Sequence, residues 1–233
     1  MKFSKHISIA ALLFTLAAPA AAQTPQFYIG VHAGKSLAVT ELSNTASTFS
    51  LDGLGMSGYV AGVHTGLDLQ LKDSPVFFGV FAGYDFQNTE FKVQFGPTSF
   101  NANLHNSWYA GGRTGAVIWG AKVYGLAAYR QSEMDTSIAT LTSPTLKGFD
   151  LGMGIAIPIA KNVSLGIEGV HTRFQKVEFE FGGVPTGIHH ELEQLTVMGR
   201  LNFTLGGNPL SVFDDRAEPP APRARDPKIM GKP

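Results

Sequence analysis

The sequence contains no cysteine, so a folded and exported form must rely on backbone pairing and burial instead of disulfides. After the first 22 residues, no segment has the run of about eighteen apolar residues that a transmembrane helix requires. Charge is balanced as well, with 18 basic and 18 acidic residues. Because nucleic-acid-binding surfaces carry an excess of positive charge, we predict no nucleic-acid partner.

A phosphate-binding loop is also missing, although the chain has 27 glycines. Pairs of glycines do occur at 62/66, 79/83 and 111/115. Their even spacing places both members of a pair on one face of a β-strand, where they act as spacers and do not form a nucleotide site.

The first 22 residues have the pattern of a secretory signal peptide. Lys2 and Lys5 form a basic region, residues 7–16 form an apolar region, and 20–22 fit the A-x-A cleavage pattern. A membrane anchor is the alternative, but the apolar run is short and rich in alanine. We predict cleavage between Ala22 and Gln23. The mature chain then has 16 basic and 18 acidic residues, a net charge of −2.

The stretch FDLGMGIAIP at 149–158 shows a strict period of two, which is typical of a β-strand with two unlike faces. One face carries Phe, Leu, Met and Ile, whereas the other carries Asp150 and small residues. Glycine on a water-facing strand surface costs backbone entropy and adds no packing. A small-residue face fits better inside a narrow closed barrel whose apolar face meets lipid.

Eight segments have this strand pattern, and together they predict an all-β fold, an eight-stranded antiparallel up-and-down transmembrane β-barrel over 23–205. The predicted strands are 26–36, 58–68, 76–87, 107–118, 123–131, 149–158, 163–174 and 194–205. Connections after the second, fourth and sixth strands are short, whereas 40–57, 88–106, 132–145 and 175–193 are long loops. This alternation is typical of outer-membrane barrels, with short periplasmic turns and long external loops. The facing of the fifth strand stays open, because both of its faces carry Tyr and Ala.

Residues 206–233 differ in composition, with six prolines and nine charged residues. Such a composition does not support a folded domain. We predict a disordered, proline-rich periplasmic tail that contacts peptidoglycan or another periplasmic partner.

The segments FYIGVHAG (27–34), FFGVFAGYDF (77–86), WYAGGRTGA (108–116), KGFDLGMGIAI (147–157), VSLGIEGVHTRF (163–174) and VMGRLNFTL (197–205) carry a family likeness. With them the chain resembles the small OmpA-type or opacity-type porin-like β-barrels of Gram-negative outer membranes. The resemblance implies location in the cell outer membrane with both termini periplasmic. It also implies contact with membrane lipids and lipopolysaccharide, and insertion by the barrel-assembly machinery. Members usually end on an aromatic residue, whereas here a tail follows Phe203-Thr204-Leu205.

Charged residues on the lumen face predict an interior salt-bridge network. Arg113, Glu168 and Arg200 have the parity of the lumen face, and an ionised group there is costly unless it is paired. We expect Glu168 to bridge one or both arginines, with Asp150 or Asp85 joining. The resemblance implies the same kind of network. A structural plug and a gated ion path are the two readings of such a network, and we favour the plug.

Two histidine motifs suggest chemistry without establishing it. His189-His190, with Glu191 and Glu193, could bind zinc or haem iron, but adjacent strand residues point to opposite faces. We therefore predict a solvated pair, no metal site and no cofactor. His171-Thr172-Arg173 is similar to part of a lipid A deacylase site, but Arg173 stands where the nucleophilic serine would be. No catalytic residue is predicted.

The leading functional hypothesis is non-enzymatic, an outer-membrane barrel with a structural or surface-interaction role in membrane integrity or adhesion. The alternatives are a narrow pore or path for small hydrophobic solutes, and a lipid A-modifying enzyme. A soluble periplasmic barrel similar to a lipocalin would require the apolar face to point inward and the glycines outward.

Overall fold

The computed structural model describes residues 25–44, 50–95, 98–136, 145–181 and 184–205. The predicted signal peptide, its cleavage site at Ala22–Gln23 and the predicted tail at 206–233 lie outside the described residues. Within the described ranges, no helix is long and apolar enough to cross a membrane.

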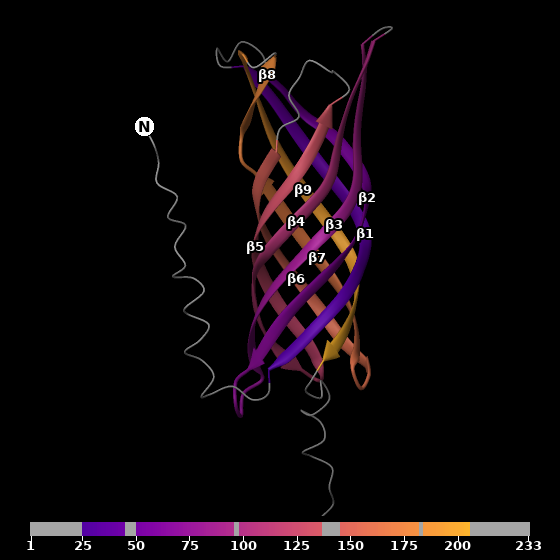
Figure 1. Ribbon diagram of the computed structural model, residues 1–233, viewed down its shortest axis with the longest axis vertical. Coiled ribbons are helices and arrows are strands. Elements are labelled where there is room, and N and C mark those ends of the chain that lie inside the picture. Colours follow the sequence, from indigo (N-terminus) through magenta and orange to yellow (C-terminus); the bar gives the residue numbers. More distant parts are fainter. Residues whose placement is uncertain (1–24, 45–49, 96–97, 137–144, 182–183, 206–233) are drawn as a thin grey trace, which may run out of the picture.

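The structure is built from β-strands that wind around a common axis (Figure 1). The strands are β1 (Gln26–Asn44), β2 (Ser50–Gln70), β3 (Val76–Phe95), β4 (Thr98–Ile118), β5 (Ala121–Thr136), β6 (Thr145–Ala160), β7 (Val163–Phe174), β8 (Val177–Phe181) and β9 (Val184–Leu205).

The wall of the barrel is closed by pairing between its first and last strands. Consecutive strands from β1 to β7 pair antiparallel, β7 pairs with β9, and β9 pairs back onto β1 from Phe27–Leu205 to Asn44–Ile188. The short β8 pairs with the first part of β9 on the edge that β7 also uses, so it extends the seventh position of the wall above β7. Eight strands therefore form the wall, which confirms the predicted eight-stranded up-and-down barrel.

Most wall strands are longer than predicted, and the excess lies at one end. β1 runs to Asn44 and β2 starts at Ser50, so much of the predicted loop 40–57 is strand. The predicted loops 88–106 and 175–193 likewise form paired ribbon over most of their length. Polar side chains there do not end the strands, because each backbone group keeps a partner on the neighbouring strand.

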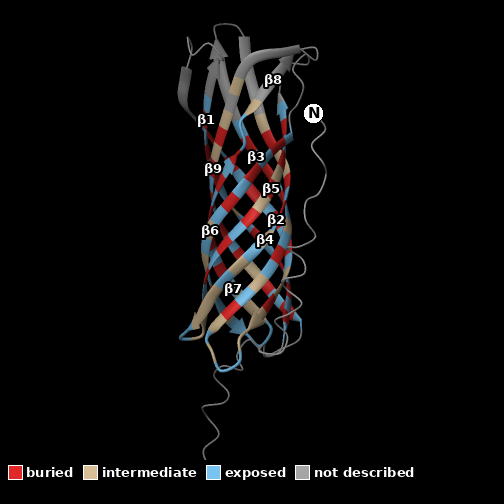
Figure 2. Cartoon of the chain, turned by 90° about the vertical axis from the view of Figure 1, so that its left-hand side faces the viewer, coloured by how far each residue is buried: buried red, intermediate tan, exposed pale blue. Residues whose placement is uncertain are grey.

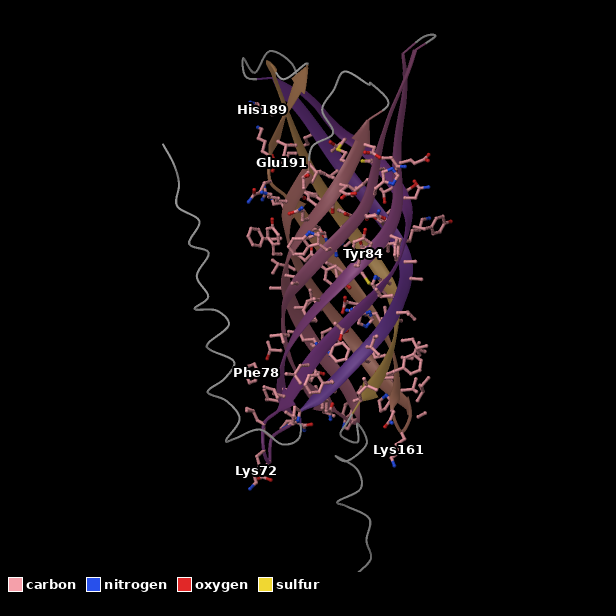
Figure 3. The ribbon with its side chains drawn as sticks, viewed as in Figure 1. Lys72, Phe78, Tyr84, Lys161, His189 and Glu191 are labelled. Carbon is pink, nitrogen blue, oxygen red and sulfur yellow. The ribbon has the colours of Figure 1, made fainter. Side chains whose placement is uncertain are left out.

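The short connections lie at the opposite end, where β1 begins and β9 ends. We call this the lower end, as drawn in Figure 1, and the flared end the upper end. Lys72 and Lys161 mark two lower turns, whereas His189 and Glu191 lie near the upper end (Figure 3). The turn between β4 and β5 has positive φ at both central residues, Trp119 at 50° and Gly120 at 83°. Two such residues suit the twist of a tight hairpin.

Along most of each wall strand, exposed residues alternate with buried or intermediate ones, which produces the chequered pattern of Figure 2. On β6 the predicted outward face is exposed, with Leu151 at 65% and Met153 at 74%. The facing of β5, open from sequence, is also resolved: Tyr124, Leu126 and Ala128 point inward. The large apolar face therefore points outward, which is the opposite of a lipocalin-like barrel.

The outward apolar residues form a belt around the barrel. On β6 the belt reaches from Phe149 to Ile159, and both residues are exposed. Ten residue steps at about 3.3 Å each, tilted by about 40°, span roughly 25 Å, the height of the apolar band of a membrane barrel. Exposed aromatic rings near the ends of this span include Phe27, Phe78, Phe86, Trp108, Phe149 and Phe203.

Candidate functional site in the barrel interior

Among the residues that the structure describes, the ionised side chains inside the barrel form three groups. We name them by height: the lower cluster (Asp68, Arg113, Lys122), the middle pair (Glu168, Arg200) and the upper cluster (Asp85, Arg130, Asp150). The four carboxylates are each 3% exposed or less. Because buried charges are costly unless paired, the number and geometry of their contacts determine whether the interior is stable.

In the lower cluster, Asp68 holds two cations. The Arg113 guanidinium donates from Nε and Nη2 to the two Asp68 oxygens at 2.9 and 2.8 Å. Lys122 Nζ donates to Asp68 Oδ2 at 2.7 Å and to Gln26 Oε1 at 2.9 Å. The Arg113 guanidinium also lies 4.3 Å from the centre of the Tyr28 ring, a cation–π distance. This cluster carries one more positive than negative charge.

The middle pair joins β7 to β9. Arg200 Nη1 donates to Glu168 Oε2, and the Tyr124 hydroxyl donates to the same oxygen at 2.9 Å. Both charged side chains are almost completely buried. This pair carries no net charge.

In the upper cluster, Arg130 lies between two carboxylates. Its Nη1 donates to Asp85 Oδ2 at 2.5 Å, and its Nε donates to Asp150 Oδ2 at 2.9 Å. Hydroxyl groups complete the shell: Thr172 donates to Asp150 Oδ1 at 2.7 Å, and Ser107 accepts from Arg130 Nη1 at 2.7 Å. With two carboxylates and one guanidinium, the cluster has an excess of one negative charge.

The structure places all five expected charged residues in the lumen but distributes them among the three groups. Glu168 contacts Arg200 as expected, whereas Arg113 contacts Asp68 in place of Glu168. Strand register explains the difference. Gly79 pairs with Asp68 on one side and with Arg113 on the other, so the three residues form one row across β2, β3 and β4. Having no side chain, Gly79 lets the two charged groups meet over it.

Sequence reasoning missed Asp68, Lys122 and Arg130. Asp68 has the parity of Gly62 and Gly66, which marks it as inward. Arg130 was missed because the facing of β5 was unsettled. The tight turn at Trp119-Gly120 sets a register in which Arg113 pairs with Leu126, and residues directly opposite in an antiparallel pair share a face. Since Arg113 was predicted to face inward, Leu126 and Arg130, which has the same parity, face inward as well.

Apolar side chains fill the interior above the upper cluster. We call this set the upper apolar layer, and it consists of Ala38, Met56, Leu104, Met134, Leu146, Phe174 and Leu192. Its members come from seven different strands, and Leu104, Leu146 and Leu192 are 1% exposed or less. Four of its members, Met56, Leu104, Met134 and Leu192, lie where loops were predicted, so a sequence reading confined to the membrane span does not detect the layer.

A small cavity lies at the lower end of the lumen. Its volume is about 30 Å³, and Tyr28, Arg113 and Lys122 are among its lining residues. This is the space of about one water molecule. Above it, the aromatic rings of Phe77, Phe81, Tyr109 and Tyr124 belong to a second buried cluster that fills the lumen.

The histidine motifs lie on the barrel surface or in the upper ribbon. His171 is half exposed and lies 3.4 Å from Glu193, and Arg173 contacts Glu191 at 2.8 Å. His189 and His190 belong to β9 and pair with Ser43 and Leu42, so they lie in a strand and not in the predicted loop. Among the residues that the structure describes, no group of three or more metal-ligating side chains is suitably placed.

A lumen filled with ion pairs, inside a wall with an apolar belt, is typical of small membrane barrels. Residues 8–190 match the family described as outer membrane protein beta-barrel domain. The chain belongs to this family. No curated protein matches it significantly.

Three solved structures of outer-membrane proteins are similar to this family member at low sequence identity. The outer membrane protein OprG from Pseudomonas aeruginosa is 8% identical with a TM-score of 0.51, covering 80% of this chain and 98% of OprG. The outer membrane protease OmpT from Escherichia coli is 9% identical with a TM-score of 0.47, covering 77% and 97%. Neisserial surface protein A is 11% identical with a TM-score of 0.43, covering 77% and 97%. At such identity the likeness to OprG concerns the fold alone.

Proposed function

We propose that this outer-membrane barrel is closed to solutes and has a structural or surface-interaction role, in membrane integrity or adhesion. One observation carries the proposal: the wall continues above the apolar belt as a ribbon whose interior is packed by the upper apolar layer. A channel needs an open external mouth, whereas a surface that binds other molecules needs a rigid outer end. Packed leucine, methionine and phenylalanine side chains support the second requirement.

The lumen below the layer supports the same conclusion. The interior ion pairs link side chains from different strands of the wall, such as Arg130 on β5 with Asp85 on β3 and with Asp150 on the adjacent β6. Ion passage would require these buried pairs to separate, which leaves uncompensated charges. The structural plug is therefore the better interpretation of the charge network than a gated ion path.

Conductance in planar bilayers tests closure. We expect no discrete current steps from the full chain. The positive control is a variant that combines Phe81→Ala, Tyr109→Ala and Tyr124→Ala, because it removes three rings of the lumen core. Steps from the unmodified protein that Arg113→Ala abolishes would contradict the proposal and favour a pore.

Trimming the upper ribbon tests the surface role. Glu90 pairs with Asn103, so residues 91–102 can be replaced by Asn-Gly, which closes a two-residue hairpin and keeps Leu104 in place. In a deletion strain we expect the full chain, but not the trimmed one, to restore the lost surface phenotype, measured as dye uptake or attachment. Equal rescue by both chains would place the role in the membrane span, and no rescue by either would refute the proposal.

The proposal includes no enzymatic step. His171 and Arg173 face outward and contact Glu193 and Glu191. The apolar belt is the surface through which we propose contact with outer-membrane lipids and lipopolysaccharide. A periplasmic contact through the tail, and recognition by the barrel-assembly machinery, remain predictions from the sequence.

A further inference from the structure

Two histidines inside the barrel lie ring against ring. His32 on β1 and His64 on β2 are 4% and 2% exposed. Their Nδ1 atoms are 3.1 Å apart, within hydrogen-bond distance. The ring centres are 5.3 Å apart, and the planes are inclined by 36°. The charge-network prediction did not include either residue, and neither contact is needed for the proposed surface role.

The pair is built from a repeated tripeptide. Gly30-Val31-His32 and Gly62-Val63-His64 are identical, and they pair antiparallel so that each histidine faces the glycine of the other strand. A Cβ at Gly30 would lie 2.5 Å from His64 Nε2, and a Cβ at Gly62 would lie 2.6 Å from His32 Nε2. Both glycines therefore leave the space that the opposite imidazole fills.

A third copy of the tripeptide shows that the face of the strand on which the histidine lies decides whether it is buried. In Gly169-Val170-His171 the valine is buried and the histidine is half exposed. His171 lies beside Leu151 on the outer face of the barrel. The same three residues thus give a lipid-side histidine on β7 and buried histidines on β1 and β2.

The contacts of the two Nε2 atoms determine how many protons the histidine pair holds. His32 Nε2 lies 2.7 Å from Asp85 Oδ1, and because a carboxylate only accepts, His32 Nε2 carries a hydrogen. His64 Nε2 lies 2.6 Å from Asn202 Oδ1, an amide oxygen that also accepts. Each ring therefore donates from Nε2. A hydrogen bond between the two Nδ1 atoms then needs one further hydrogen, which makes the pair a cation.

Charge balance favours this cation over a neutral pair. Rotating the Asn202 amide would let its nitrogen donate to His64 and leave both rings neutral, and such orientations are assigned from hydrogen bonding. The neighbouring upper cluster, however, has two carboxylates and only Arg130 as a cation. The other ionic neighbours, Glu168 and Arg200, neutralise each other. A positive charge at His32, in contact with Asp85, brings the upper cluster to neutrality.

The other groups around the pair are tyrosine rings and a cation. The rings of Tyr28 and Tyr109 lie 6.0 Å from His64 and 6.4 Å from His32. The lower cluster carries the opposite excess, one positive charge, but its two cations contact Asp68, whereas His32 contacts Asp85 directly. Burial among tyrosine rings disfavours a charged imidazole, so the cation depends on its contact with Asp85, an attraction that the low local dielectric strengthens.

We propose that His32 and His64 form a proton-binding site in the lumen, sharing one proton between their Nδ1 atoms and holding a single positive charge that completes the upper cluster. The site is an internal counter-ion whose charge depends on pH. Loss of its proton leaves one buried carboxylate without compensation, so the barrel is less stable on the alkaline side of this step.

Nitrogen-15 NMR of histidine-labelled protein in lipid bilayers at pH 7.5 tests the site. We expect three protonated ring nitrogens for the pair, at a pH where free imidazole is largely neutral. His32→Gln and His64→Gln assign the signals, and His171→Gln is the matched control because it removes a histidine of the same tripeptide from the outer face. Two protonated nitrogens for the pair, one on each ring, would overturn the proposal.

Asp150→Asn supplies an independent check, because Asp150 belongs to the upper cluster through Arg130. Removing this carboxylate cancels the excess negative charge, so we expect the pair to lose its third hydrogen at pH 7.5. Retention of that hydrogen in Asp150→Asn would overturn the charge argument. Should the variant fail to fold, a pH titration of the unmodified protein replaces it: release of the third hydrogen below the range of free imidazole would overturn the site, and release above it would support the site.

Discussion

Arg130 is the residue whose removal tests the interior charge network most directly. Arg130→Met keeps most of the apolar length of the side chain but leaves Asp85 and Asp150, each 2% exposed or less, without their shared cation. Removing one partner of a buried ion pair costs about 3–5 kcal/mol. With a urea dependence of about 2 kcal/mol per molar, the unfolding midpoint falls by about 2 M.

The assay is urea unfolding of the barrel in lipid vesicles, followed by tryptophan fluorescence. The chain has two tryptophans, Trp108 on the outer face and Trp119 in a lower turn, so emission reports on both ends of the span. Loss of heat-modifiability on a denaturing gel gives a second readout of the same change.

Arg173→Met is the matched control. Arg173 also contacts two carboxylates, Glu191 and Glu193, but its side chain is 66% exposed. Solvent screens such a pair, so we expect the midpoint to stay where it is. Adding Asp85→Asn and Asp150→Asn to Arg130→Met removes the uncompensated charges and recovers much of the loss. Equal midpoints for the two arginine variants would refute the argument that burial makes the upper cluster essential.

Two further pairs of substitutions test the packing of the lumen and the position of the belt. Gly83→Ala places a Cβ 2.3 Å from the buried Tyr109 hydroxyl and should cost about 1–3 kcal/mol in unfolding free energy, whereas Gly112→Ala, whose nearest neighbour is 3.6 Å away, should be neutral. Similar midpoints for both would show that the tyrosine does not pack over the glycine. Met153→Arg, in the middle of the β6 belt, should cost about 2–4 kcal/mol in bilayers, and Tyr59→Arg near the upper edge about 0–1 kcal/mol. Insertion experiments that rank these two variants in the reverse order would place the belt elsewhere on the wall.

Period-two patterning was sufficient to predict the wall of this barrel. Phe149, Leu151 and Met153 alternate with Asp150 and Gly152, and the facing of such a strand follows from the pleat alone. Eight such segments with alternating connection lengths define an up-and-down order, because each short connection joins neighbours. The ends of the strands were predicted less well. Above the belt, polar residues outside and Met56 or Leu104 inside weaken the apolar signal, although backbone pairing continues.

Interior partners depend on register, which no single strand contains. The sequence predicted that Arg113 faces inward. Its contact with Asp68 instead of Glu168 follows from the row that Asp68, Gly79 and Arg113 form across three strands. The same holds for His32 and His64, whose tripeptides are identical in sequence and meet only because β1 and β2 pair in that register. Alternation along a strand is a local property and is written in the sequence. Which charges meet in the lumen depends on the register between strands, and only the tertiary structure decides it.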